Sequence, residues 1–144
     1  MQANLQAWQA RRAGGLPAVQ PGGPAGRYFS GSWDSLSALL PQLGLAGSYD
    51  VVLSAETIYS PAAAASLLAC IKACLKRPGG EAYIAAKSYY FGVGGGTAAF
   101  RQLVQADGAL RVEGCRLYED GASNRREILR LAWVEAAPAP EGSD

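Results

Sequence analysis

The histidine and cysteine content decides which chemistries the chain can carry. Its 144 residues include no histidine, which removes the commonest metal ligand and every Ser-His or Cys-His catalytic pair. Cys70 and Cys74 are four residues apart on one helix face, but Cys115 is the only other cysteine, so ordinary helix packing is favoured over zinc binding. The sequence therefore argues against zinc enzymes and histidine-dependent hydrolases, and it predicts no metal site.

A glycine-rich run, from Gly92 to Gly96, follows one predicted strand and precedes a predicted helix. This is also the place of a phosphate-binding turn, but the spacing is not G-x-G-x-x-G and no Lys-Ser/Thr pair follows. We interpret these glycines as residues that let the backbone bend over a substrate and approach it closely. Phosphate binding is the less favoured alternative.

Apolar patterning and turn residues predict strands that alternate with helices. The predicted strands are 27–31, 49–55, 81–87, 111–118 and 125–134, and the predicted helices are 1–13, 34–43, 60–77 and 97–106. Asp34 is the expected cap of one helix, and Ser60 followed by Pro61 marks the start of the next. Residues 14–26 are rich in glycine and proline and predict a flexible loop, and residues 135–144 predict a disordered tail.

This order of elements predicts an α/β fold with a mostly parallel sheet, to which a terminal hairpin adds one antiparallel strand at an edge. The continuous apolar run at 49–55 is typical of a strand covered on both faces. In open α/β sheets, ligands bind beyond the carboxyl ends of the strands. Three such ends are polar, aromatic or glycine-rich, and we expect the functional site there: 30–34, 54–59 and 87–96.

Size and charge narrow the class of protein further. A chain of 144 residues with 49% hydrophobic and 17% charged residues forms one domain at most. The 13 basic residues are scattered and nearly balanced by 12 acidic ones, which argues against direct nucleic-acid binding. No apolar run of about 18 residues and no secretory pattern occurs, so we expect no membrane span and a reducing cytosolic or nuclear location.

The same three segments carry a resemblance to a known family. RYFSGSW (27–33), YDVVLSAETIY (49–59) and KSYYFGVGGG (87–96) resemble the protein-histidine N-methyltransferases, a family of seven-strand, Rossmann-like enzymes that depend on S-adenosylmethionine. The tetrapeptide ETIY at 56–59 matches the acidic-x-x-aromatic motif of the wider group that methylates protein side chains. The run YFGVGGG at 90–96 matches the narrower signature of the histidine branch.

The resemblance implies roles for residues of all three segments. Glu56 and Tyr59 would be catalytic, with Glu56 accepting the N–H of the substrate ring or fixing the substrate backbone, and Tyr59 walling the pocket. The implied cofactor-binding residues are Gly31, Ser32, Trp33, Ser54 and Ala55. The implied substrate-binding residues are Lys87, Tyr89, Tyr90, Gly92, Gly94 and Gly95.

Several of these residues also have plainer structural alternatives. Glu56 precedes the helix at Ser60, where the helix dipole favours an acidic residue. Trp33 either stacks on the adenine or fills the gap between helix and sheet, and Lys87 either serves the pocket or ends its strand in solvent. Phe91 is favoured as a core residue.

Two motifs of the family have no counterpart in this chain: the glycine-rich loop after the first strand and the acidic residue that ends the second. The resemblance extends from Asn4 to Val134 and implies an N-terminally truncated domain, residues 1–134, that lacks the first two strands. In the family's strand order these two strands separate the third from the fourth. Residues 27–31 would then lack a neighbour and 49–55 would have an open edge, so we expect the isolated chain to fold poorly, or only from strand 49–55 onward.

The activity that the resemblance implies is S-adenosylmethionine-dependent methylation of a histidine in a large-subunit ribosomal protein. The enzyme would be cytosolic or nuclear and a monomer at full length, and the present chain would be inactive as a fragment. One alternative is a non-enzymatic fragment or pseudo-methyltransferase that binds a protein through the glycine-rich loop. Another is a protein-lysine methyltransferase, because the acidic-x-x-aromatic motif is shared.

Overall fold

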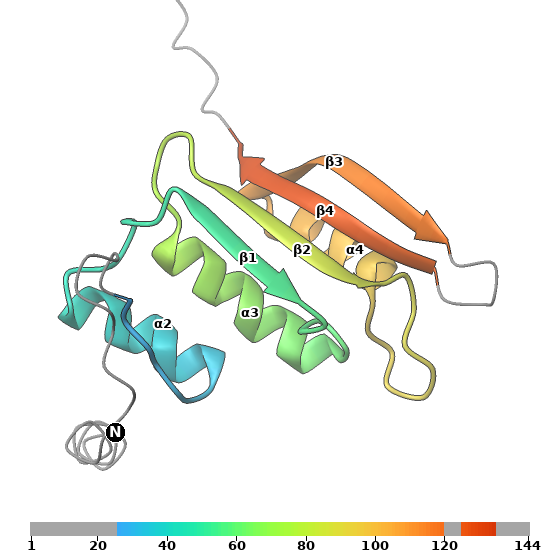
Figure 1. Ribbon diagram of the computed structural model, residues 1–144, viewed down its shortest axis with the longest axis horizontal. Helices are drawn as coiled ribbons and strands as arrows, with labels where there is room; N and C mark the ends of the chain where they lie inside the picture. The colour runs from blue at the N-terminus through green and yellow to red at the C-terminus, as the bar shows by residue number, and fades with distance from the viewer. Residues whose placement is uncertain (1–25, 120–124, 135–144) are drawn as a thin grey trace, which may run out of the picture.

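A four-stranded sheet with three helices makes up the described part of the chain (Figure 1). The computed structural model describes residues 26–119 and 125–134. The helices are α2 (Trp33–Gln42), α3 (Pro61–Cys74) and α4 (Thr97–Asp107), and the strands are β1 (Val51–Ala55), β2 (Glu81–Lys87), β3 (Leu110–Glu119) and β4 (Arg125–Trp133). The expected helix 1–13, nearly all of the loop 14–26 and the tail 135–144 lie outside the described residues, so the domain boundaries stay a prediction.

The strand order in the sheet is β1-β2-β4-β3. Strand β1 pairs with β2 in parallel, whereas β4 runs antiparallel to both β2 and β3. The antiparallel strand is therefore inserted one place in from the edge, and two of the three described ladders are antiparallel. Three of the four described strands, β1, β2 and β3, run in the same direction, which agrees with the mostly parallel sheet predicted from the sequence. The predicted edge position of the antiparallel strand is wrong, because the hairpin docks on β2 through its second strand.

Local signals fixed the start of α3. The Ser60 side chain accepts a hydrogen bond from the Ala63 backbone N–H at 3.3 Å, and Pro61 is the first helical residue. The predicted cap is therefore confirmed. The helix ends at Cys74 rather than at the predicted Arg77, because the following residues pair with Tyr49, whose carbonyl accepts the Lys76 N–H at 2.8 Å.

Helix α2 begins one residue earlier than predicted and has a different cap. The Ser32 hydroxyl caps it by accepting the Ser35 N–H at 3.2 Å. Asp34 lies inside the first turn and accepts a hydrogen bond from the Ser66 hydroxyl of α3 at 3.0 Å. The predicted cap is wrong. How the isolated chain folds stays a prediction.

The predicted strand at 27–31 does not form in the described part of the chain. A strand needs a neighbour whose N–H and C=O groups complete its ladder. These residues do not belong to the four-stranded sheet of the described residues. The outer edge of β1 is likewise open among the described residues.

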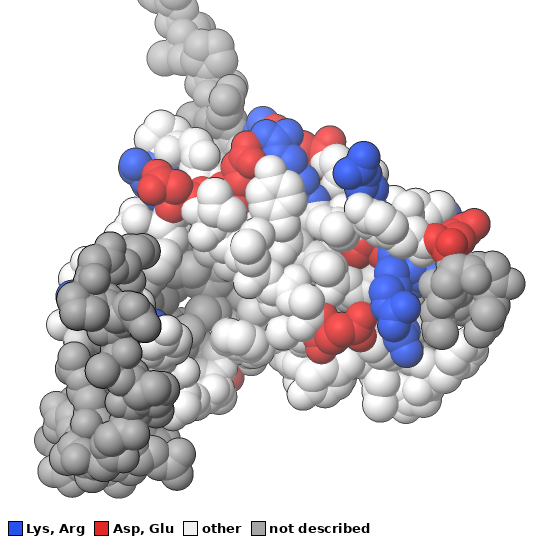
Figure 2. Space-filling model, in the orientation of Figure 1, with Lys and Arg blue, Asp and Glu red and all other residues white. Residues whose placement is uncertain are grey.

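One face of the sheet carries the core and the other is largely bare. Side chains of α3 and α4 pack in a single cluster against alternate residues of β2 and β4, with Ile71, Ile84, Phe100 and Leu131 at most 1% exposed. On β1, by contrast, Val51 is 53% and Leu53 76% exposed, and Figure 2 shows this region as an uncharged surface. The expectation that this strand is covered on both faces is therefore wrong for the described residues. No helix in the described ranges is long and apolar enough to cross a membrane.

Candidate functional site

A cluster of charged and aromatic side chains lies where β1 and β2 end and β4 begins. Glu56 follows β1, Lys87 is the last residue of β2, and Tyr90 lies in the loop after it. Arg126 of β4 is the direct register partner of Lys87. This is because β4 runs opposite to β2 and therefore begins at the end of the sheet where β2 ends. Figure 2 shows acidic and basic side chains next to one another at this end of the sheet.

The Glu56 carboxylate is contacted at both oxygens. The Tyr90 hydroxyl donates a hydrogen bond to Oε2 at 2.6 Å, and Nε of Arg126 lies 3.6 Å from Oε1. Burial, together with this hydrogen bond, raises the pKa of Tyr90 above its ordinary value. Half of the Glu56 side chain remains exposed, so the carboxylate has a defined direction and is still open to a ligand.

The backbone of Glu56 is strained. Its φ of 56° makes it the only non-glycine residue with a positive φ in the described ranges. Its N–H donates to the Ala85 carbonyl at 2.8 Å, which continues the β1–β2 ladder by one residue and holds this conformation. Left-handed geometry costs a non-glycine residue roughly 1–2 kcal/mol, and such strain is concentrated at functional sites.

Replacing Glu56 tests this strain. We expect Glu56→Gly to be more stable than Glu56→Ala by about 1 kcal/mol, because only glycine adopts a positive φ without strain. Urea denaturation of the two variants gives the difference. At the neighbouring Ala55, which lies in extended strand, Ala55→Gly should be destabilising by about 0.5–1 kcal/mol. Equal stabilities of the two Glu56 variants would show that the left-handed conformation carries no strain.

Lys87 and Tyr90 also contact one another. The Lys87 backbone N–H donates to the Tyr90 hydroxyl at 3.3 Å, and Nζ of Lys87 lies 5.8 Å from the centroid of the Tyr90 ring. Lys87 therefore belongs to the cluster, which favours its role in the pocket over the alternative of a strand end in solvent. Its role in binding substrate stays a prediction.

The other aromatic residues of the site point outward. Tyr59 is 52%, Tyr89 55% and Phe91 89% exposed. The rings of Tyr89 and Phe91 pack edge to face, with their centroids 5.2 Å apart. The expectation that Phe91 lies in the core is wrong, because the loop after β2 turns away from the sheet through glycines with positive φ. These side chains form an exposed aromatic surface beside Glu56's motif.

The glycines of this loop divide into two groups. Gly92 and Gly94 are exposed and have φ values of 79° and 73°, so both need the conformational freedom of glycine. Gly95 is buried, and a Cβ on it would lie 2.2 Å from the Tyr59 carbonyl carbon. The structure thus gives a packing reason for glycine at 95, whereas substrate contact at all three positions stays a prediction.

The residues predicted to bind the cofactor lie apart from this cluster or are already engaged. Gly31 is exposed, Ser32 caps α2, and Trp33 packs against the core, which favours the gap-filling alternative. Ser54 shares a hydrogen bond of 2.6 Å with the Thr57 hydroxyl, and Ala55 is exposed. The described residues do not by themselves enclose a cofactor, and cofactor binding at these five positions stays a prediction.

Arg126 is the residue of the cluster that sequence reasoning missed. Site residues are expected at the carboxyl ends of parallel strands, whereas Arg126 lies near the start of an antiparallel strand. The signal was nevertheless present, because a terminal hairpin implies an antiparallel strand whose amino end lies at that same edge. Its place beside Lys87 required the register of β2 with β4.

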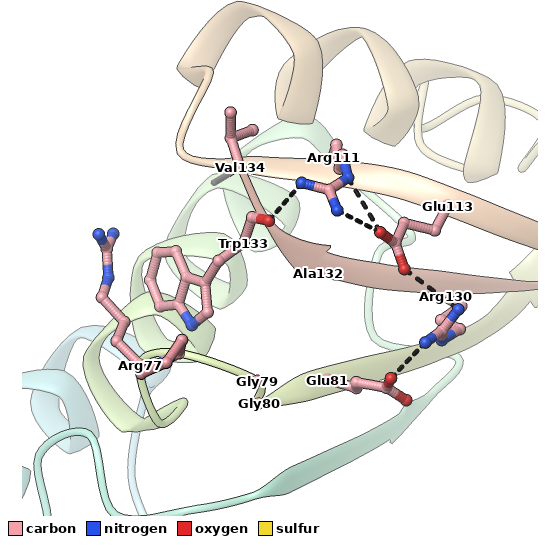
Figure 3. A pocket seen from close by; sticks show the side chains of 11 residues that line it. Arg77, Gly79, Gly80, Glu81, Arg111, Glu113, Arg130, Ala132, Trp133 and Val134 are labelled. Carbon is pink, nitrogen blue, oxygen red and sulfur yellow. Dashed lines mark hydrogen bonds and ion pairs between the residues drawn. The ribbon is translucent and has the colours of Figure 1, made fainter. Parts of the chain in front are cut away.

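A hollow of about 550 Å³ lies at the opposite end of the sheet (Figure 3). Its charged groups are paired with one another: Glu113 contacts both Arg111 and Arg130, and Arg130 also contacts Glu81. Arg130 and the Tyr83 hydroxyl lower the pKa of Glu81 to about 2. Arg77 stacks on Trp133, with its guanidinium carbon 3.4 Å from the ring centroid. This internal pairing indicates a structural charge network rather than a second candidate site.

The fold and the cluster together define an α/β domain with a site at the carboxyl ends of its parallel strands. No family model matches the chain. The histidine protein methyltransferase 1 homologue of Dictyostelium discoideum is 34% identical over 105 residues, which cover 73% of this chain and 32% of that relative. The Rattus norvegicus homologue is 34% identical over 107 residues, which cover 74% and 29%. The chain belongs to the histidine protein methyltransferase family, and it spans about a third of the length of the curated relatives that it matches.

Proposed function

We propose that the chain forms the acceptor side of a protein-histidine N-methyltransferase site. The observation that supports this most directly is Glu56, whose backbone is left-handed and whose carboxylate is held by Tyr90 and Arg126. It is also the acidic residue of the acidic-x-x-aromatic motif, which ends at Tyr59. A carboxylate fixed in this way is suited to orient a substrate group that carries an N–H.

Methylation of histidine requires alignment more than it requires a strong base. Imidazole has a pKa near 6.5, so most rings are uncharged at pH 7 and already have a nucleophilic nitrogen. In the proposed site, Glu56 accepts a hydrogen bond from the N–H of the ring nitrogen that is not methylated. This hydrogen bond directs the lone pair of the other ring nitrogen toward the methyl donor. Alignment of two reactants can contribute up to about 7–11 kcal/mol.

S-Adenosylmethionine is the proposed cofactor and would supply, when bound, a methyl group on a positively charged sulfur. Gly31, Ser32, Trp33, Ser54 and Ala55 are its proposed neighbours on the strength of the family resemblance. We further propose that β1 and β2 correspond to the fourth and fifth strands of a seven-strand sheet. The open edge of β1 supports this proposal, because a further strand would pair there. The exposed Val51 and Leu53 also fit it, because further parts of such a domain would cover that face of the sheet.

The substrate and the location are proposals that rest on the resemblance. We propose a histidine of a large-subunit ribosomal protein as the substrate, a cytosolic or nuclear enzyme, and a monomer at full length. The relatives are histidine protein methyltransferase 1 homologues by name, which supports methylation of a protein histidine by those proteins.

A chimera tests the proposed function. The matching segment of the Dictyostelium relative is replaced by the corresponding residues of this chain, and the product is incubated with S-adenosylmethionine and a histidine-containing protein substrate of that relative. We expect mass spectrometry to locate the methyl group on histidine, and calorimetry to show micromolar binding of S-adenosylhomocysteine. A folded chimera that methylates lysine would favour the lysine alternative.

The exposed aromatic surface favours one second candidate, a non-enzymatic module that binds a protein through the glycine-rich loop. Phe91 is 89% exposed and contacts Tyr89, an arrangement suited to docking of an apolar peptide segment. A chimera that is folded and binds a protein partner, yet neither binds S-adenosylhomocysteine nor transfers a methyl group, would support this candidate.

A further inference from the structure

Two cations and one carboxylate meet at the proposed acceptor position. Lys87 and Arg126 are directly opposite one another on neighbouring strands. Like charges in such a pair destabilise a sheet unless an opposite charge balances them. Glu56 supplies that charge from the loop after β1, 3.6 Å from Arg126, while Lys87 remains beside the Tyr90 ring.

This balance changes what the carboxylate attracts. An unpaired, half-exposed carboxylate would favour a cation such as a lysine ammonium. Here the charge of Glu56 is already offset by Arg126, and Lys87 adds a further positive charge nearby. A carboxylate has about four acceptor positions, so Glu56 can still accept one N–H while it holds Tyr90 and Arg126.

We propose that Arg126, with Lys87, selects the acceptor by making the Glu56 end of the site receptive to an uncharged N–H donor such as imidazole and unfavourable to a protonated amine. The inference rests on the proposed function and gives it a chemical basis for choosing histidine over lysine. Arg126 acts through Glu56 and is a positioning residue.

Two small probes test this selection on the full chain without methyl transfer. Imidazole and butylammonium are titrated at about pH 8.5, where the first is uncharged and the second is charged. The ¹³C resonance of the Tyr90 ring carbon that bears the hydroxyl reports binding. We expect wild-type protein to bind imidazole more tightly, and Arg126→Gln to shift the affinity ratio toward butylammonium by about fivefold, the size expected for a half-exposed ion pair.

Matched variants separate the charge of Arg126 from its packing. Arg126→Lys keeps the charge and should retain the preference for imidazole. Arg125→Gln removes the neighbouring arginine, which pairs with Glu119 and Glu127, and should behave like wild type. A wild-type preference for butylammonium, or the absence of binding by either probe, would overturn the proposal.

The titration of Tyr90 gives a second, independent readout. The positive charge of Arg126 favours the tyrosinate, and the negative charge of Glu56 opposes it. Arg126→Gln should therefore raise the pKa of Tyr90, and Glu56→Gln should lower it. An unchanged pKa in Arg126→Gln would refute the action of Arg126 on this pair. Neither the probe titrations nor the titration of Tyr90 involves methylation. A chimera that fails to methylate would therefore reject the proposed function, whereas the charge selection would be tested by the two titrations alone.

Discussion

Gly95→Ala is expected to destabilise the protein by about 3 kcal/mol, near the upper end of what a single overpacking substitution costs. The added Cβ would lie 2.2 Å from the Tyr59 carbonyl carbon and 2.4 Å from the Ile58 oxygen. A backbone hydrogen bond from the Gly96 N–H to the Ile58 carbonyl at 2.9 Å holds the two segments together, and one from the Tyr90 N–H to the Gly95 carbonyl at 3.2 Å closes the loop itself. The added methyl group would therefore have to displace backbone atoms of residues 58–59, which cannot move aside as a flexible side chain can.

Gly92→Ala is the matched control for this loop. Gly92 has a φ of 79° but no atom within 4 Å of its Cβ position, so only the backbone strain of roughly 1–2 kcal/mol is expected. Urea denaturation monitored by tryptophan fluorescence compares the two variants. If Gly95→Ala were no less stable than Gly92→Ala, the close packing of the loop on residues 58–59 would be refuted. Loss of that packing should also broaden the resonances of Tyr90, which is held by the same loop.

Glu56→Gln in the active chimera should lower the rate of histidine methylation by about 100-fold or more, the range found when one oriented polar group is removed from an active site. Glutamine keeps the size of the side chain and an oxygen that can accept the Tyr90 hydrogen bond. It loses the negative charge of Glu56, which pairs with Arg126 and strengthens the hydrogen bond that the N–H of the substrate ring donates. The effect should therefore appear in kcat, measured as methyl groups transferred to a histidine peptide.

Two comparisons give the result its meaning. Glu119→Gln removes an exposed carboxylate of β3 that pairs with Arg125, and it should leave methylation unchanged. Binding of S-adenosylhomocysteine should be the same in Glu56→Gln as in the unsubstituted chimera. Full activity of Glu56→Gln would reject Glu56 as the orienting group and favour its alternative role as an acidic residue before α3.

Elements with local signals were predicted from the sequence with few errors. The bounds of β2 at 81–87 agree with the prediction, and so does the start of α3, where Ser60 and Pro61 act within one turn of chain. The end of α3 was predicted less well because Tyr49, far away in sequence, pairs with the residues after Cys74. Phe91 was assigned to the core because its type favours burial, and only the path of the glycine loop places it in solvent.

The sequence by itself determined the order of helices and strands, the family resemblance and the acidic-x-x-aromatic motif, because each depends on residue types at short spacings. Only the tertiary structure decided that β4 lies between β2 and β3, and with it that Arg126 meets Glu56. It also decided that Gly95 is a packing residue, since the atoms it approaches belong to a segment more than thirty residues earlier. The physical reason is the same in both cases: register and close approach arise between segments distant in the chain, and no local pattern of residues encodes the distance between them.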